Sequence, residues 1–396
     1  MSVKIYKNGR FRDLHGQKIF QNGSWVTLPS VARIHLNNTW YPLGTGPVFM
    51  QPETLQPAQY YIDLNGYLRT FDSGYSSQIF DNNGMWTAIS GKESCMGIRD
   101  GRLFKIVNGT LQQVGNSALW TAISTPQNCG AGYSYGICDG KLYYITPGGE
   151  LNQVGTLSGW TIITGYGEYA QGSYSSVDVY GYGICNGRLY YLKNGTAAQI
   201  GSFEDWTTIS GYSQPSGDYK CIAFAIRTGK LYALVGESCY QFGQYSDWTA
   251  VSGCCYNTWD NATGTACISA LAIRAGALYK LNAGNGAGSS MAEYTLIPDL
   301  SIYISSNQLY LQDYTPKQIC GAGKAYSYGC VLTADGVVFA VNLQSGDLNV
   351  VRSNLNAVAI AGTYFTSNAN STTIIGLMAY ESNGAYQTIP IEIREY

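Results

Sequence analysis

Residues 182–211 run YGICNGRLYYLKNGTAAQIGSFEDWTTISG, and this stretch decides the fold. It contains a short apolar strand, an Asn-Gly turn, a partner strand and a second Asn-Gly turn. A third strand that ends in Gln-Ile-Gly follows, and a strand that begins at Trp206 ends the unit. Asn-Gly supplies the positive φ angles that a two-residue hairpin turn requires. The stretch therefore predicts four short antiparallel strands in one unit.

The same unit recurs along the chain, and such a recurrence is typical of repeat architectures. Three more copies join a Gly-x-Leu-aromatic turn to a Trp strand: GRLF at 101–104 to WTAIS at 120–124, GKLY at 140–143 to WTIITG at 160–165, and GKLY at 229–232 to WTAVSG at 248–253. A degenerate copy covers 66–90, and another begins at 276. Four strands in about 34 to 47 residues match one blade of a β-propeller. We predict an all-β propeller with essentially no helix, because no segment shows a sustained period of 3.6 residues.

The number of blades follows from the hairpin turns. Clear turns occur at seven glycines: Gly66, Gly101, Gly140, Gly187, Gly229, Gly276 and Gly336. We therefore predict about seven blades, with 307–310 and 383–386 as an eighth blade or as pieces that complete the ring. Propellers leave only short, protected strand edges. We expect 389–393 to lie in the same blade as 60–62 and to close the ring.

One Trp occupies the same position in each clear repeat, namely Trp86, Trp120, Trp160, Trp206 and Trp248. The simplest role for such a residue is packing between blades.

The N-terminus has a different repeat. KIYKNG at 4–9, KIFQNG at 18–23 and RIHLNN at 33–38 recur roughly every 14 residues, and each predicts a hairpin. Three hairpins are too few to bury a sizeable core alone. We expect residues 1–43 to form a small module for anchoring or oligomerisation, 44–58 to form a Pro-containing linker, and 59–396 to form the propeller.

Composition narrows the partners. Charged residues make up 12% of the 396 residues, against roughly 25% in typical domains. The net charge is −2. We therefore expect no electrostatic binding to nucleic acid or to acidic membranes. No apolar stretch approaches the roughly 20 residues of a membrane span, and the N-terminus has no secretory signal pattern.

The Cys and His residues predict no metal site and no cofactor. There are 11 Cys and two His, no Cys-x-x-Cys pair, and no cluster with the ligand spacing of zinc. Cys138 and Cys185 occupy the same repeat position, which favours buried free thiols. The main exception that we consider is a clip from Cys254 or Cys255 to Cys267.

The repeat motifs Asp/Asn-Gly-x-Leu-Tyr, Gln-Val-Gly and Trp-x-x-Ile-Ser/Thr-Gly resemble two related kinds of propeller over about residues 59–380. One kind is the regulator-of-chromosome-condensation repeat, and the other is the tectonin repeat of sugar-binding lectins. The chain lacks the basic faces and most of the His residues of the chromatin-associated members. Nucleotide exchange on a GTPase is therefore not expected.

The tandem hairpins, which end in WYPLG at 40–44, resemble N-terminal modules of tailed-phage structural proteins. They are similar to fibre or tail-associated proteins of gut phages, including the crAss-like group. This resemblance implies a virion protein that is made in the host cytoplasm. It also implies that residues 1–43 contact other virion proteins and that the chain forms a homo-oligomer in the assembly.

Candidate ligand-binding residues lie where the repeats vary most in length, between each Trp strand and the next strand. Equivalent loops of a propeller emerge on one face, and these insertions are rich in aromatic and small polar residues, a composition that suits recognition. We expect rings to stack on sugars while Asn and Asp bind hydroxyl groups. The alternative is that the loops only cap the ring or contact neighbouring subunits. The candidates are Tyr166, Tyr169, Tyr174, Tyr180, Tyr212, Asp218, Tyr219, Tyr256, Asn257, Trp259, Asp260, Tyr364 and Phe365.

Catalysis finds little support, and no catalytic residue is predicted. Both His residues lie in the N-terminal module, which excludes a His-based triad within the predicted propeller. A pair of carboxylates for glycoside hydrolysis is not excluded, but the Asp boxes of sialidase propellers are missing.

We therefore expect a non-enzymatic virion protein whose propeller recognises host surface glycan or neighbouring virion proteins. The alternatives are a tectonin-like carbohydrate-binding lectin and, third, a polysaccharide-degrading propeller enzyme. The ligand, the head or tail location and the copy number are left open by the sequence.

Overall fold

The computed structural model of the chain contains only β-strands as regular elements in the part that it describes, which confirms the predicted all-β fold. Side chains are described for a smaller set of residues, most of them between 60 and 281. The described backbone comprises 4–7, 10–13, 18–21, 24–27, 33–36, 39–42, 60–62, 66–71, 77–90, 95–107, 109–124, 132–169, 177–209, 222–251, 256–260, 265–284, 293–296, 315–321, 328–334, 338–342, 348–352, 357–362, 372–381 and 386–394.

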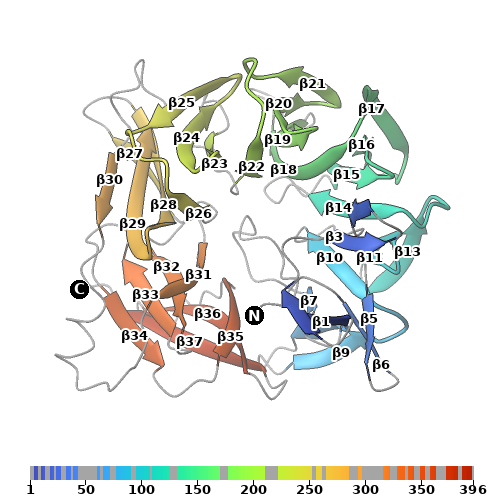
Figure 1. The fold of residues 1–396 in the computed structure, drawn as a ribbon, viewed down its shortest axis with the longest axis horizontal. Helices are drawn as coiled ribbons and strands as arrows, with labels where there is room; N and C mark the ends of the chain where they lie inside the picture. Colours follow the sequence, from blue (N-terminus) through green and yellow to red (C-terminus); the bar gives the residue numbers. More distant parts are fainter. Residues whose placement is uncertain are drawn as a thin grey trace.

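Antiparallel sheets follow one another around a ring (Figure 1). Four of them contain four strands in chain order. They are β10 (Trp86–Ser90), β11 (Cys95–Arg99), β12 (Arg102–Val107) and β13 (Thr110–Val114); β14 (Trp120–Ser124), β15 (Ser134–Cys138), β16 (Lys141–Ile145) and β17 (Leu151–Ser158); β18 (Trp160–Tyr169), β19 (Val177–Cys185), β20 (Arg188–Lys193) and β21 (Thr196–Gln199); and β22 (Trp206–Ile209), β23 (Ile222–Arg227), β24 (Lys230–Val235) and β25 (Ser238–Phe242).

The next sheet has a fifth strand, because β27 pairs with β28 beside the usual four. Its strands are β26 (Trp248–Val251), β27 (Tyr256–Asp260), β28 (Thr265–Arg274), β29 (Ala277–Gly284) and β30 (Glu293–Leu296). A further four-stranded sheet contains β31 (Pro316–Gly321), β32 (Tyr328–Thr333), β33 (Val338–Asn342) and β34 (Leu348–Arg352).

Two three-stranded sheets complete the described strands of the ring. They are β7 (Tyr60–Ile62), β8 (Leu68–Phe71) and β9 (Ser77–Asp81), and β35 (Ala357–Gly362), β36 (Thr372–Glu381) and β37 (Tyr386–Arg394). The prediction that 389–393 lie in the same blade as 60–62 is wrong. Strand β37 pairs along its length with the long β36, and β7 pairs with β8, so the first and the last strands of the ring belong to different sheets.

The described strands thus form eight sheets around the ring, where the sequence predicted about seven blades. Of the two segments weighed for an eighth blade, 307–310 lies outside the described residues, and Tyr386 begins a strand of the last sheet. The turn predicted at Gly336 also lies outside them.

The Trp strand begins five of the described sheets, whereas the sequence placed it at the end of the repeat unit. Trp120 pairs with Cys138 of the strand that follows it, and Trp160 pairs in the same way with Cys185. Figure 1 shows β14, β22 and β26 near the centre of the ring, with β13, β21 and β25 at its rim. The backbone N–H of Trp120 donates to the carbonyl of Gly101 at 2.9 Å, and the other four Trp residues make the same bond. Each of these bonds joins an innermost strand to a turn of the preceding sheet.

The two-residue turns between second and third strands have the predicted geometry. Asp139 and Gly140 have φ angles of 50° and 68°, and Asn186 and Gly187 have 49° and 75°. Positive φ at both positions marks the type I′ turn, whose twist matches that of the flanking strands. The β26–β30 sheet has Ala275 at φ 48° in this position, so the turn persists without Asn or Asp.

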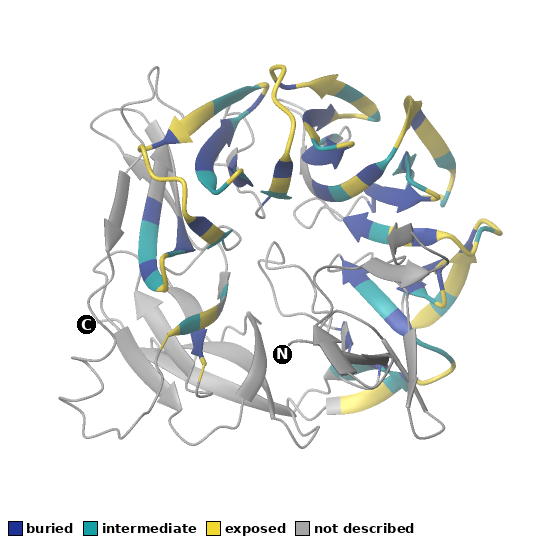
Figure 2. Ribbon diagram, viewed as in Figure 1, coloured by how far each residue is buried: buried dark blue, intermediate teal, exposed yellow. Residues whose placement is uncertain are grey.

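The hydrophobic core lies in seams between neighbouring sheets. Trp160 packs with Tyr135 and Ile137 of the preceding sheet and with Val179 of its own. Clusters of the same two-sheet composition surround the other four indoles, and all five are buried. Figure 2 shows buried residues on the inner strands and many exposed ones on β13, β17 and β21. The prediction that these Trp residues pack between blades is confirmed.

A glycine lies beneath the indoles of Trp86, Trp120 and Trp160 and permits their close approach, whereas Ala225 and Ala272 stand at this position in the sheets of Trp206 and Trp248. A Cβ atom on Gly183 would lie 2.7 Å from Cζ3 of Trp160, and one on Gly136 would lie 2.7 Å from Cζ3 of Trp120. Densely packed interiors do not tolerate such contacts without a shift. The Gly-Ile-Cys pattern of the sequence therefore reflects the close approach of a ring to the backbone.

The three predicted N-terminal hairpins are confirmed as two-stranded sheets. They pair β1 (Lys4–Lys7) with β2 (Arg10–Asp13), β3 (Lys18–Gln21) with β4 (Ser24–Thr27), and β5 (Arg33–Leu36) with β6 (Thr39–Pro42). Their role as a separate module remains a prediction, and the predicted linker 44–58 lies outside the described residues. Within the described part of the chain, no helix could span a membrane.

Candidate functional site

The path of the chain gives the ring two faces. The "turn face" carries the two-residue turns between second and third strands and the linkers that enter each Trp strand, because the Trp N–H groups bond to carbonyls of those turns. The "loop face" carries the connections between first and second strands, together with the turns between third and fourth strands. The predicted ligand-binding residues that the structure describes belong to connections of the loop face.

The structure turns part of the predicted loops into strands. Tyr166 and Tyr169 lie on β18, and Tyr180 lies opposite Tyr166 on β19. Val177, Val179 and Tyr180 at the start of β19 are residue types that favour strands and support this continuation of the ladder. Four more candidates, Tyr256, Asn257, Trp259 and Asp260, lie on the extra strand β27. Tyr174, Tyr212, Asp218, Tyr219, Tyr364 and Phe365 lie outside the described residues.

Among these candidates, the side chain of Tyr180 is described, and its position is fixed. Its ring stacks with that of Tyr191 at 6.2 Å between centroids, and Nζ of Lys193 lies 5.3 Å from its centroid. Its hydroxyl group donates to Oδ2 of Asp178 at 3.0 Å. Tyr180 is half-buried, so one part of the ring packs on the sheet while another reaches solvent.

Hydrogen bonds from Asn194 hold the base of the β18–β19 hairpin. Nδ2 of Asn194 donates to Oδ1 of Asp178 at 2.6 Å, and Oδ1 of Asn194 accepts from the N–H of Val179 at 2.7 Å. The N–H of Asn194 donates to the carbonyl of Val179 at 2.8 Å. Asn194 has φ 45°, a left-handed conformation that Asn tolerates better than most residues. The turn after β20 thus fixes the strand that carries Tyr180.

Buried phenol groups connect neighbouring sheets at this face, a feature that the sequence analysis did not predict. The hydroxyl of Tyr135 accepts from the N–H of Gly195 at 3.1 Å and donates to the carbonyl of Val179 at 3.3 Å. Tyr182, at the same position of the next sheet, donates to the carbonyl of Gly236 at 3.1 Å. Burial raises the pKa of Tyr135 far above its ordinary value, so it stays a protonated donor. The Tyr-Gly-Ile-Cys pattern shared by both repeats was the available signal.

The Tyr135 hydrogen bonds to the neighbouring sheet form what we call a latch. A stacked pair of rings adds aromatic surface beside it. Tyr133 and Tyr144 lie 5.5 Å apart between centroids with planes 17° from parallel, and both are half-exposed. Tyr144 also packs against Gly195, where an added Cβ would lie 3.2 Å from its ring. The loop face therefore presents rings whose positions are set by two sheets at once.

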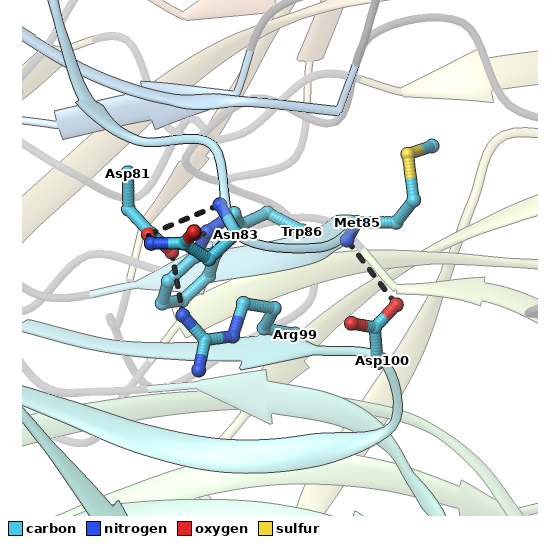
Figure 3. A network of polar contacts seen from close by, with 6 residues as sticks. All are labelled: Asp81, Asn83, Met85, Trp86, Arg99 and Asp100. Atoms are coloured by element: carbon cyan, nitrogen blue, oxygen red, sulfur yellow. Dashed lines mark hydrogen bonds and ion pairs between the residues drawn. The ribbon is translucent and has the colours of Figure 1, made fainter.

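The turn face contains a different polar network, around Asp81 (Figure 3). Oδ2 of Asp81 accepts from Nε1 of Trp86 at 2.8 Å and from Nη1 of Arg99 at 2.7 Å. Asn83 donates to Oδ1 of Asp81 from both its backbone and its side chain. Burial acts to raise the pKa of Asp81, but these hydrogen bonds outweigh it and hold the pKa below its ordinary value. The network joins the β7–β9 sheet to the β10–β13 sheet.

The described part of the chain contains no cluster of three or more His, Cys, Asp or Glu side chains that could hold a metal ion. Cys95, Cys138 and Cys185 are buried free thiols, and burial raises the pKa of Cys95 and Cys185. The predicted free thiols are confirmed for these residues. The side chains of Cys254, Cys255 and Cys267 are outside the described set, so the clip remains untested.

No family model matches the chain, and no curated protein matches it. Among solved structures, the C-terminal WD40 domain of Sif2 is similar, with TM-score 0.51, 10% identity, and coverage of 88% of this chain and 99% of that domain. The chain has a β-propeller fold. Apo AztD from Citrobacter koseri has TM-score 0.47 and 8% identity, with coverage of 84% and 95%. YCF48 from Cyanidioschyzon merolae has TM-score 0.43 and 9% identity, with coverage of 80% and 97%.

At such identities the likeness concerns the fold alone, because one fold hosts many functions. The predicted propeller is confirmed. Membership of the chromosome-condensation or tectonin type, and the link to phage, remain resemblances of sequence. The function must be argued from the residues of the propeller itself.

Proposed function

We propose that the chain is a non-enzymatic component of a phage virion, in which the loop face of the propeller recognises host surface glycan. The N-terminal hairpins would attach it to other virion proteins. The observation that carries the glycan proposal is the β18–β19 hairpin, which extends beyond the usual strand length and places Tyr166 opposite Tyr180.

The fixed base of this hairpin supports a binding role. Asn194 and Tyr135 hold Asp178 and Val179 through hydrogen bonds from the turn after β20 and from the preceding sheet. A recognition surface that is rigid before binding loses less conformational entropy when it binds. Tyr supplies large contact area at low entropic cost, and neighbouring polar groups add adaptable hydrogen bonds.

The chemistry of the face suits a sugar. Binding sites for small ligands combine aromatic walls with a few polar groups that fix orientation. The half-exposed rings of Tyr133, Tyr144 and Tyr180 can pack on the apolar faces of pyranose rings. Strand β27 adds Asn257, Trp259 and Asp260 to connections of the same face.

We also propose that the protein has no catalytic activity. Both His residues precede residue 43, and the described side chains form no metal cluster. Binding a ligand without converting it requires neither a catalytic His nor a metal ion.

The proposal is tested by titrating the full-length protein with purified host surface polysaccharide. We expect saturable binding, and a loss of at least about tenfold in affinity in Tyr169→Ala/Trp259→Ala, equivalent to about 1.4 kcal/mol. The matched control is Tyr240→Ala, because Tyr240 is 41% exposed but lies on the outer strand β25. Binding that survives in the double variant, or release of reducing sugar by the wild type, would refute the proposal.

A further inference from the structure

The turn face carries a regular band of exposed apolar side chains. Six large hydrophobic side chains are exposed among the described residues, and four of them lie in the linkers that enter consecutive Trp strands. The exposed fractions are 56% for Leu119, 43% for Leu157, 45% for Phe203 and 42% for Tyr245. These five-residue segments are 115–119, 155–159, 201–205 and 243–247, and in the second of them residues 155–158 still belong to strand β17. Hydrophobic residues scattered singly need no explanation, but here one exposed apolar side chain recurs before each of four consecutive Trp strands.

The four linkers share one face because each ends in the same hydrogen bond. The N–H groups of Trp120, Trp160, Trp206 and Trp248 donate to carbonyls of the preceding sheet's turn at distances of 2.9 or 3.0 Å. The linkers therefore follow one another along an arc from the β10–β13 sheet to the β26–β30 sheet. Figure 2 shows those before β22 and β26 as continuous exposed segments.

Arginine side chains hold the two aromatic members in place. Cζ of Arg227 lies 4.4 Å from the ring centroid of Phe203, and Cζ of Arg274 lies 3.3 Å from that of Tyr245. Nε of Arg274 also donates to Oδ1 of Asp247 at 2.7 Å. Cation–π contacts of this kind stabilise ring positions. The exposed rings are thus fixed features that require little ordering when a partner binds.

Charges of both signs surround the band. The first residue of the third strand is cationic in four consecutive sheets, at Arg102, Lys141, Arg188 and Lys230. Exposed carboxylates stand in the adjoining turns and linkers, at Asp100, Asp139, Glu204, Asp205 and Asp247. A partner with charge of a single sign would meet repulsion on such a surface. A surface with the same alternation of charges can instead place each cation against an anion.

We propose that the turn face is the docking surface for a second copy of this chain, joined face to face by a twofold axis. A twofold interface uses the same patch on both partners, so a patch of mixed charge with an apolar band complements itself. Its size is sufficient, because stable interfaces use about 20–30 residues on each side, and the four linkers alone hold five residues each. Both loop faces then point outward. The inference does not depend on the proposed function.

Sedimentation of the full-length protein over a wide range of concentrations tests this surface. We expect Phe203→Ser/Tyr245→Ser to halve the mass of the assembly, whatever oligomer the N-terminal hairpins form. Leu119→Ser/Leu157→Ser should have the same effect, and this second variant keeps the test valid if the first fails to fold. The matched control is Ile79→Ser/Tyr240→Ser, which removes exposed apolar groups from outer strands and should leave the mass unchanged.

Two outcomes would overturn the proposal. In one, the wild type and both turn-face variants have equal mass at every concentration. In the other, the control variant dissociates as readily as the turn-face variants, which would place the contact at the rim.

Discussion

The two faces of the propeller follow different rules. On the turn face two contacts recur: the Trp N–H bond to a Gly carbonyl is made at five of the described seams, and the donation from Gln153 to Gly155 O is repeated at Gln199 and Gly201. On the loop face the contacts differ from sheet to sheet. Tyr135 and Tyr182 form latches there, whereas the next sheet has Phe224 in that position and can make no such bond.

The turn face therefore specifies the fold, and the loop face is free to vary. Repeated contacts on the turn face fix the register and the angle between blades. The loop face can then carry additions such as the long β18–β19 hairpin or the extra strand β27 without disturbing the ring. Binding residues on a rigid scaffold are the usual result of this division.

The largest expected effect comes from breaking a seam at the turn face. Trp160→Ala removes a buried indole that packs between two sheets, and we expect a loss of about 3–5 kcal/mol in the free energy of unfolding. Chemical denaturation followed by circular dichroism measures it. Ile79→Ala, at a 50% exposed position of the outer strand β9, is the control and should change stability little. Equal effects of both changes would show that the seam is not the source of stability.

The polar seam around Asp81 is the next test. Asp81→Asn weakens hydrogen bonds to Arg99 and Trp86 in a buried site, and we expect a loss of about 3 kcal/mol. Asp139→Asn, a change of the same chemistry in an exposed turn, should cost nothing measurable.

The contribution of Asp81 also depends on pH. Its folded pKa lies below the ordinary value of 3.8, so its stabilisation is present above that pH and is lost as pH falls below it. The wild type and Asp81→Asn should therefore approach equal stability in acid. A gap that stays constant down to the lowest pH at which both fold would contradict this account.

A smaller effect is expected where glycine meets the indole. Gly183→Ala places a Cβ against Trp160 and should cost about 2 kcal/mol. The β22–β25 sheet provides the comparison, because Ala225 occupies the same position opposite Ile209. Ala225→Gly should not raise stability. If Gly183→Ala proves neutral in thermal unfolding, the seams are looser than the contacts imply.

The smallest effect tests a loop-face latch. Tyr135→Phe removes the hydroxyl that bridges Gly195 and Val179, and we expect a loss of about 1 kcal/mol together with faster amide hydrogen exchange at Val179 and Gly195. Tyr133→Phe, on the half-exposed neighbour, is the control. Unchanged exchange in Tyr135→Phe would show that the latch does not hold the hairpin.

The sequence predicted the features that repeat. Asn-Gly and Asp-Gly turns, a Trp in each repeat and the hairpin alternation gave the all-β propeller, the inter-blade role of Trp and the N-terminal hairpins, because each depends on local geometry. Blade boundaries were harder. A Trp strand looks the same in sequence whether it ends one sheet or begins the next, and the pairing of β14 with the following strand, with Trp120 opposite Cys138, decides the question.

The site was predicted in location rather than in form. Variable length marks a connection of the loop face, but it does not show that 165–169 and 177–182 continue the sheet. The Asp81 network was missed because Asp81 stands where other repeats have Val114 or Val154, and nothing local indicates a partner 18 residues later at Arg99. Contacts between sheets depend on the assembled ring.

Hydrogen exchange of the full-length protein, with and without host surface polysaccharide, tests most directly which face recognises the ligand. We expect slower exchange in β18, β19, β27 and β28, and no change in the linkers 115–119 and 201–205 of the turn face. Slower exchange in those linkers, with none in β18 and β19, would contradict it.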